Sequence, residues 1–280
     1  MVQGQLELTS LQRIVTEPIP RLTWDVEGLL VRGDRCVIYG EWGTYKTFLA
    51  VSLGLHLAAG RPWLGFPVPD QRRVLYVDEE MNRQTAVRRV HRLFRGAPNL
   101  DDSGAPFMLM SRQGLRINEY EGTKLLQALK EQYQFCPDVI ILDALRRVLV
   151  GNENAAEDVA KFWTNLNRLS REGITIVVLH HMSKKSANPE HRRDIRDRAS
   201  GSTDIMAGID SAWALTKTAK NTAQVQPVKA RDQKEPESFE FLLEDDADDE
   251  DSPITLRLNT APKIAKVPSG DIWAAPFIEN

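Results

Sequence analysis

The chain has 280 residues, of which 42% are hydrophobic and 27% are charged, a composition typical of one or two globular domains with a sizeable core. The formal net charge is −3 at pH 7, which excludes a generic polyanion binder. Any contact with nucleic acid therefore has to come from local basic patches.

The cysteines and the N-terminus exclude further classes. Cys36 and Cys136 are the only cysteines, and each lies in or beside an apolar run, so we expect buried thiols and no disulfide framework or metal cluster. Residues 1–10 lack the basic and apolar regions of a secretory signal. No apolar stretch approaches the roughly 20 residues that span a bilayer. We expect a cytoplasmic protein without a membrane partner.

Short apolar runs alternate with amphipathic segments over the first two thirds of the chain. The expected strands are Cys36–Tyr39, Val74–Val77, Phe107–Met110, Val139–Leu142 and Ile174–Leu179. Between them, apolar residues recur at three- and four-residue spacing, as in helices. The clearest helix contains Val159 to Leu169, with Asn154 as its predicted N-cap and Gly173 as its end. This alternation predicts an α/β fold with a mostly parallel sheet covered on both faces.

After about residue 200 the pattern changes to consecutive strands with short connections. These are expected at Ser211–Thr216, Gln226–Ala230, Ser238–Leu243 and Pro253–Leu258. They predict antiparallel hairpins at one edge of the sheet, and the acidic run Glu244–Asp251 predicts a solvated loop between the last two. We expect an N-terminal arm (1–20), one domain (21–259) and a C-terminal tail (260–280).

The segment from Gly40 to Thr47 reads G-E-W-G-T-Y-K-T and lies between an apolar strand and the apolar stretch Phe48–Ala59. This is the setting of a G-x-x-x-x-G-K-[ST] phosphate loop, with Tyr45 in place of the second glycine. Loop amides and the helix N-terminus would hold phosphates, Lys46 would reach the terminal ones, and Thr47 would bind Mg²⁺. An ordinary loop is the alternative. The expected nucleotide-binding residues are Gly40, Glu41, Trp42, Gly43, Thr44, Tyr45, Lys46, Thr47 and Phe48.

Acidic residues end two of the predicted strands. Asp143 follows Ile140–Leu142, where an acid can hold Mg²⁺ at the carboxyl end of the strand next to a phosphate loop. Its alternative role is to cap the following turn. Glu80 is the preferred general base for polarising water, with Glu79 in reserve. Alternatively, both glutamates favour the N-terminus of the next helix through its dipole.

Basic and imidazole side chains complete the candidate site. His180 and His181 end a third strand and are candidate sensors of the γ-phosphate, or packed histidines. The basic segment 182–198 would line a channel for a phosphate backbone, or is an exposed loop. Lys229 and Arg231 share one face of a strand and can reach a neighbour's anion, or form an inert surface pair. The candidate DNA-binding residues are Lys184, Lys185, Arg192, Arg193, Arg196 and Arg198.

From Thr23 to Leu258 these motifs, in this order, resemble the RecA-like ATPases of the hexameric helicase group, most of all the plasmid RepA helicases. Residues 24–33 and 198–203 are similar to that family's lead-in to the first strand and its R-[AG]-S segment. The resemblance implies a P-loop ATPase of the AAA type. It also implies catalytic roles for Lys46, Glu80, Asp143, His180, His181, Lys229 and Arg231.

The resemblance further implies that Lys229 and Arg231 act on the γ-phosphate of a neighbouring subunit, so that the chain forms a ring such as a hexamer. We therefore expect an ATP- and Mg²⁺-dependent helicase or translocase on single-stranded DNA. A nucleotide-dependent switch that binds a protein partner is the alternative, favoured by the net charge and by Tyr45. A structural protein with an empty site is the third possibility.

Overall fold

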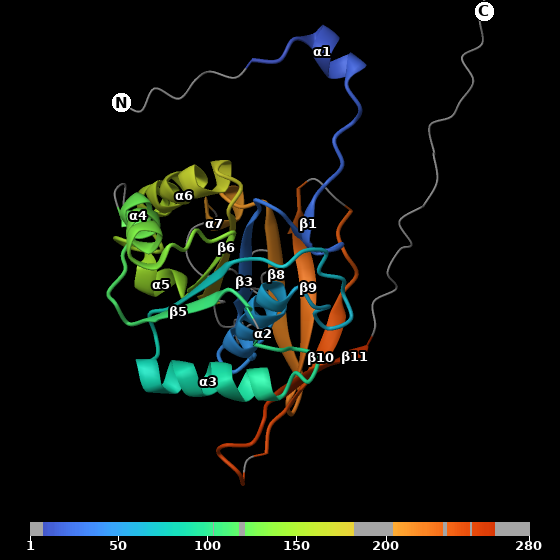
Figure 1. The fold of residues 1–280 in the computed structure, drawn as a ribbon, viewed down its shortest axis with the longest axis vertical. Helices are drawn as coiled ribbons and strands as arrows, with labels where there is room; N and C mark the ends of the chain where they lie inside the picture. Colours follow the sequence, from blue (N-terminus) through green and yellow to red (C-terminus); the bar gives the residue numbers. More distant parts are fainter. Residues whose placement is uncertain are drawn as a thin grey trace, which may run out of the picture.

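The computed structural model describes residues 8–102, 104–117, 121–181, 204–231, 234–246 and 248–260 (Figure 1). Its strands are β1 (Trp24–Val26), β2 (Leu30–Val31), β3 (Arg35–Gly40), β4 (Val74–Asp78), β5 (Phe107–Ser111), β6 (Val139–Asp143), β7 (Thr175–His181), β8 (Ser211–Ala219), β9 (Thr222–Ala230), β10 (Phe239–Glu244) and β11 (Thr255–Thr260). Its helices are α1 (Leu11–Thr16), α2 (Lys46–Ala59), α3 (Arg83–Arg95), α4 (Glu121–Tyr133), α5 (Leu145–Val148), α6 (Ala156–Arg171) and α7 (Asp204–Ala207).

A nine-stranded sheet forms the centre of the molecule, in the order β11-β10-β9-β8-β3-β7-β6-β4-β5. The strands from β8 to β5 pair in parallel, whereas β9, β10 and β11 are added as antiparallel hairpins. The predicted mostly parallel sheet with antiparallel strands at one edge is confirmed. All strands of the parallel part end at one side of the sheet, which we call the carboxyl edge.

Alternation along β3 shows how the sheet builds a core on each face. Cys36 and Ile38 pack into the hydrophobic cluster that contains α2 and α3, whereas Val37 and Tyr39 pack into the cluster that contains α5 and α6. All four side chains are fully buried, as expected for a strand covered on both sides.

Two local predictions were wrong. Helix α6 has Ala155 as its N-cap without a capping side chain, and Asn154 instead donates its backbone N–H to Asn152 Oδ1 (2.9 Å). Cys36 is buried, but Cys136 is exposed because it lies in the connection before β6, where strand alternation does not yet apply. Gly173 does follow the end of α6, with the left-handed φ of +79°.

The acidic run forms the loop between β10 and β11 and extends past the sheet beside α3 (Figure 1). Its described residues after Glu244 are exposed, so the predicted solvated loop is confirmed, and three of these residues also form ion pairs. Arg88 is paired with Glu250 (3.1 Å) and Asp251 (3.2 Å), and Arg92 is paired with Asp245. The run therefore fastens the last hairpin to α3.

The N-terminal segment with α1 lies away from the sheet (Figure 1), and none of the residues of α1 is buried. Among the described residues, no helix has both the length and the apolar character needed to cross a membrane.

Candidate functional site

The loop between β3 and α2 lies at the carboxyl edge, and glycines shape it in two ways. At Gly40, a Cβ atom would come within 2.7 Å of the Leu215 carbonyl oxygen and of Thr44 Oγ1, so only glycine fits. Gly43 has open space around it but a φ of +75°, which glycine adopts without strain. The loop backbone thus packs closely against its neighbours at Gly40 and turns sharply at Gly43, as a phosphate loop requires.

Tyr45 adopts a left-handed backbone conformation, of the kind that glycine adopts without strain. Its φ is +64° and its ψ is +22°, the left-handed region, and it caps the N-terminus of α2 with its backbone. The ring packs toward Phe48 and beneath Lys217, whose Nζ is 5.2 Å from the ring centroid. The hydroxyl lies 3.4 Å from Asn221 Oδ1 in the β8–β9 turn. The tyrosine side chain thus connects the loop to the β8–β9 hairpin.

Lys46 opens α2, and its ammonium group turns back over the loop. Nζ donates to the carbonyl oxygens of Gly40 (2.9 Å) and Glu41 (2.8 Å). Burial lowers the pKa of Lys46 to about 8, although the carboxylates of Asp143 and Glu80 oppose the shift. The ammonium therefore lies in a partly desolvated place where an added anion would interact strongly with it.

Asp143 is buried at the end of β6. Tyr76 donates its hydroxyl proton to Asp143 Oδ2 (2.9 Å). Burial and the neighbouring Asp78 raise the pKa of Asp143 to about 6, although a hydrogen bond with Thr47 opposes this. The N-cap of the following turn is Ala144, so Asp143 does not cap it.

The donor set of Asp143 and Thr47 fits Mg²⁺. A carboxylate and a hydroxyl are hard oxygen ligands, and Mg²⁺ sites use few protein ligands because phosphates and water supply the rest. The described residues contain no cluster of three or more acidic, histidine or cysteine ligands, so this pair is the metal-binding candidate there. The sequence placed Asp143 on the strand next to the phosphate loop. That was wrong, because β7 lies between β3 and β6.

The acids after β4 have separate surroundings. Asp78 accepts the backbone N–H groups of Glu80 (3.0 Å) and Met81 (2.7 Å). Glu79 accepts those of Gln113 and Leu115 at Oε1 (both 3.1 Å) and that of Gly114 at Oε2 (3.0 Å). Glu79 therefore holds the 113–115 loop, with both of its oxygens occupied.

Glu80 is the acid that faces the phosphate loop. Its side chain is 24% exposed, and Oε1 lies 3.6 Å from His181 Nε2. The neighbouring His181 imidazole lowers the pKa of Glu80, so the carboxylate is ionised at neutral pH. Helix α3 is capped by Asn82 and has no acid in its first turn.

His180 is fully buried, whereas His181 reaches the phosphate loop. The rings of His181 and Trp42 are stacked, with centroids 4.4 Å apart and planes inclined by 12°. The pairing of Gly40 with His181 across β3 and β7 brings them together. The structure thus gathers Lys46, Thr47, Glu80, Asp143 and His181 at one place.

Lys229 and Arg231 lie at the other end of the sheet, because Ala230 pairs with Ser211 at the start of β8. Lys229 Nζ donates to the Met206 carbonyl oxygen (2.5 Å), and burial lowers its pKa. Arg231 donates to Asp210 Oδ1 (3.0 Å). These two residues are separated from the phosphate loop by the length of β3, about 17 Å at the rise of a strand.

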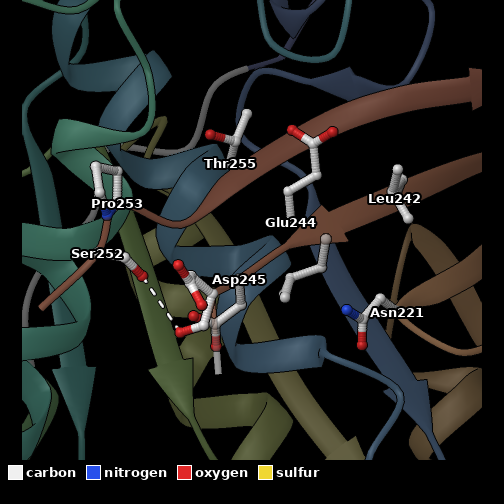
Figure 2. A pocket seen from close by; sticks show the side chains of 9 residues that line it. Asn221, Leu242, Glu244, Asp245, Ser252, Pro253 and Thr255 are labelled. Atoms are coloured by element: carbon white, nitrogen blue, oxygen red, sulfur yellow. Dashed lines mark hydrogen bonds between the residues drawn. The ribbon is translucent and has the colours of Figure 1, made fainter. Parts of the chain in front are cut away.

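The candidate DNA-binding residues Lys184, Lys185, Arg192, Arg193, Arg196 and Arg198 lie outside the described residues. A pocket at the base of the acidic loop is shown in Figure 2, with Asn221, Glu244, Asp245, Ser252 and Thr255 among its lining residues. Its carboxylates disfavour a phosphate there.

A second pocket is lined by Phe48 of α2, by Thr85, Arg88, Arg89 and Arg92 of α3, and by Asp245, Asp246 and Glu250 of the acidic loop. The Arg89 guanidinium lies 4.9 Å from the centroid of the Phe48 ring. Sequence reasoning included Phe48 but missed the arginines of this pocket, and it missed Tyr76. Tyr76 could have been found from strand alternation, because it lies two residues before Asp78 and therefore on the same face.

Comparisons with known proteins agree with this geometry. A family model described as AAA domain matches residues 3–187. Among curated proteins, no sequence matches the chain. Similar solved structures are the ATPase domain of G40P (TM-score 0.56, 13% identity, 75% of this chain and 82% of that one) and the RadB recombinase (TM-score 0.52, 16% identity, 80% and 90%). A DnaB-like replicative helicase is also similar (TM-score 0.58, 13% identity, 77% of this chain).

The chain spans 57% of the length of that DnaB-like helicase, and at these identities the similarity establishes the fold. The predicted RecA-like P-loop fold is confirmed. Since the AAA domain model matches well over half of the residues, the chain belongs to the AAA domain family, with the fold of RecA-like ATPase domains.

Proposed function

We propose that the chain is an oligomeric ATPase that acts on single-stranded DNA, as a RepA-like replicative helicase or translocase. The observation that supports it most is the convergence of a phosphate loop, a buried acid and an ionised glutamate at the carboxyl edge. Ligands of parallel α/β sheets bind outside this edge.

Each residue has a role in hydrolysis. Loop amides and Lys46 bind the phosphates, and Thr47 with Asp143 holds Mg²⁺, which neutralises charge on the phosphates when bound. Glu80 accepts a proton from the attacking water and orients it. The histidines that end β7 sense the γ-phosphate.

Lys229 and Arg231 act in trans in this proposal. Their position at the opposite end of the sheet supports it, since they cannot reach a nucleotide held by their own loop. Cations supplied by a neighbour are worth about three to five orders of magnitude in turnover in related systems. Mixing Lys46→Ala protein with Arg231→Ala protein should restore activity, because some interfaces then combine an intact loop with an intact arginine. Recovery of no activity would argue against action in trans.

The first test is steady-state ATP hydrolysis with and without single-stranded DNA, beside Lys46→Ala and Glu80→Gln. We expect turnover that rises with DNA and is lost in both variants, while Glu80→Gln still binds Mg-ATP. Alanine at the six basic residues of segment 182–198 should weaken DNA binding and its salt dependence.

Nucleotide binding that DNA does not affect, without turnover, would instead support the alternative, an ATP-dependent switch acting on a protein partner. Mg-ATP that fails to raise the unfolding temperature would indicate an empty structural site, because a ligand of the native state must stabilise it.

A further inference from the structure

Trp42 occupies an unusual position for a large aromatic residue. It is 76% exposed and belongs to neither hydrophobic core cluster of the described chain. Its stack on His181, at 4.4 Å and 12°, is the ring contact that fixes it. Removing the indole would open no core cavity, so its value to the fold through packing is small.

His181 lies between Trp42 and Glu80. Its Nε2 is 3.6 Å from Glu80 Oε1, whereas its Nδ1 is buried and has no hydrogen-bond partner among the described residues. Histidines are usually oriented by a hydrogen bond at the second ring nitrogen. Within the described part of the chain that bond is missing, so the stack with Trp42 is the contact that orients the imidazole there.

Glu80 itself is only partly enclosed, with 24% of its side chain exposed, and a glutamate side chain has several rotamers to choose from. The contact with His181 is the largest influence on its ionisation. Whatever holds His181 in place therefore also limits where the Glu80 carboxylate can lie.

We propose that Trp42 is a positioning residue, which presses the His181 imidazole against Glu80 and so sets the place from which Glu80 orients the attacking water. The inference rests on the proposed ATPase function. It extends that function because the stacked rings of Trp42 and His181 link the position of the phosphate loop to the position of the general base, Glu80.

A double-mutant cycle tests this, using wild type, Trp42→Ala, His181→Ala and the double variant. We expect Trp42→Ala to lower kcat at least tenfold, while the Kd for Mg-ATP changes less than threefold. In the His181→Ala background, the Trp42 substitution should have no further effect, because coupled residues are not additive. Trp42→Phe should restore most of kcat, whereas Trp42→Leu, of similar bulk but without an aromatic face, should not.

Additive effects of the two substitutions would overturn the proposal, as would a loss confined to nucleotide affinity. Tyr133→Ala, which removes another exposed aromatic residue, is the matched control and should leave kcat unchanged. Thermal unfolding of each variant checks the fold. If Trp42→Ala does not fold, Trp42→Leu replaces it in the cycle.

Absence of turnover in the wild type, with Mg-ATP still bound, would refute the hydrolytic function separately. The same four proteins would then be compared for their preference for ADP–aluminium fluoride over ADP, which reports the transition-state geometry. A preference that depends on Trp42 only when His181 is present would uphold the positioning role. A preference that is the same in all four would overturn it.

Discussion

Neighbouring residues of identical type have different tasks at this site. Glu79 and Glu80 follow the same strand, yet Glu79 accepts three backbone N–H groups of the 113–115 loop and Glu80 faces His181. The direction of each side chain at the strand end decides this. The pair therefore separates a loop-holding contact at Glu79 from the candidate site at Glu80.

Substituting these glutamates should show that separation. We expect Glu79→Ala to lower the free energy of unfolding by about 1–3 kcal/mol, because hydrogen bonds to a charged acceptor are lost. Glu80→Gln should leave stability almost unchanged and abolish turnover. Urea denaturation and ATPase assays of both proteins check the prediction, and the reverse assignment of effects would contradict it.

At position 45 the phosphate loop carries a tyrosine side chain where the motif has glycine. The left-handed φ of Tyr45 costs roughly 1 kcal/mol relative to glycine, but the ring contacts Phe48 and Lys217. Tyr45→Gly should therefore keep the Kd for Mg-ATP within about threefold, since relief of strain offsets the lost contacts. Tyr45→Val should weaken binding clearly, because a β-branched residue disfavours positive φ. Isothermal titration calorimetry measures the Kd for Mg-ATP of both variants. Equal affinities of Tyr45→Gly and Tyr45→Val would contradict the argument from backbone conformation.

At the scale of elements, the acidic loop and α3 are joined by arginines with different degrees of burial. The Arg92 side chain is 15% exposed and donates to the Ser252 carbonyl oxygen (2.7 Å) and hydroxyl (3.1 Å), whereas Arg88 is 44% exposed. The loop also bonds to α3 through backbone, since Ile254 N donates to the Arg92 carbonyl oxygen (3.0 Å). We therefore expect the less exposed contacts of Arg92 to contribute more to the stability of the loop on α3 than the exposed ion pairs of Arg88.

We expect Arg92→Ala to destabilise the protein by about 1–3 kcal/mol, since it leaves buried acceptors unpaired. Arg88→Ala should have little effect, because exposed ion pairs contribute little and salt screens them. Thermal unfolding at low and high salt measures the stability of both variants. A loss of stability in Arg88→Ala as large as that in Arg92→Ala would refute the prediction.

At the scale of the molecule, the two ends of the sheet have separate electrostatics. The carboxyl edge carries the candidate site, whereas the opposite end carries Asp210, which binds Arg35 through Nε (2.7 Å) and Nη2 (2.8 Å) and also binds Arg231. Burial opposes ionisation of Asp210, but the hydrogen bonds from Arg35 outweigh it and hold the pKa below its ordinary value.

This depressed pKa predicts a pH dependence of stability. The contribution of Asp210 is present above the unfolded pKa of about 3.9 and is lost as the pH falls through the lower folded value. Asp210→Asn should therefore be less stable than wild type by about 1–3 kcal/mol at pH 7. The difference should shrink as the pH falls below about 4, where the carboxylate of the unfolded wild-type chain takes up a proton, and it should be lost once the folded carboxylate is protonated as well. Denaturant titrations across this range measure it, and a pH-independent difference would contradict the assignment.

The sequence by itself determined the strands, most helices and the phosphate loop, because the periods of strands and helices and the spacing of a loop motif are local properties of the chain. It also placed Glu80 and Asp143 at the carboxyl edge, since parallel strands end on the same side. Only the tertiary structure decided that β7 separates β3 from β6, that Glu79 holds the 113–115 loop, and that Trp42 stacks on His181. Those features depend on contacts between residues far apart in the chain, and no local pattern encodes which distant groups will meet.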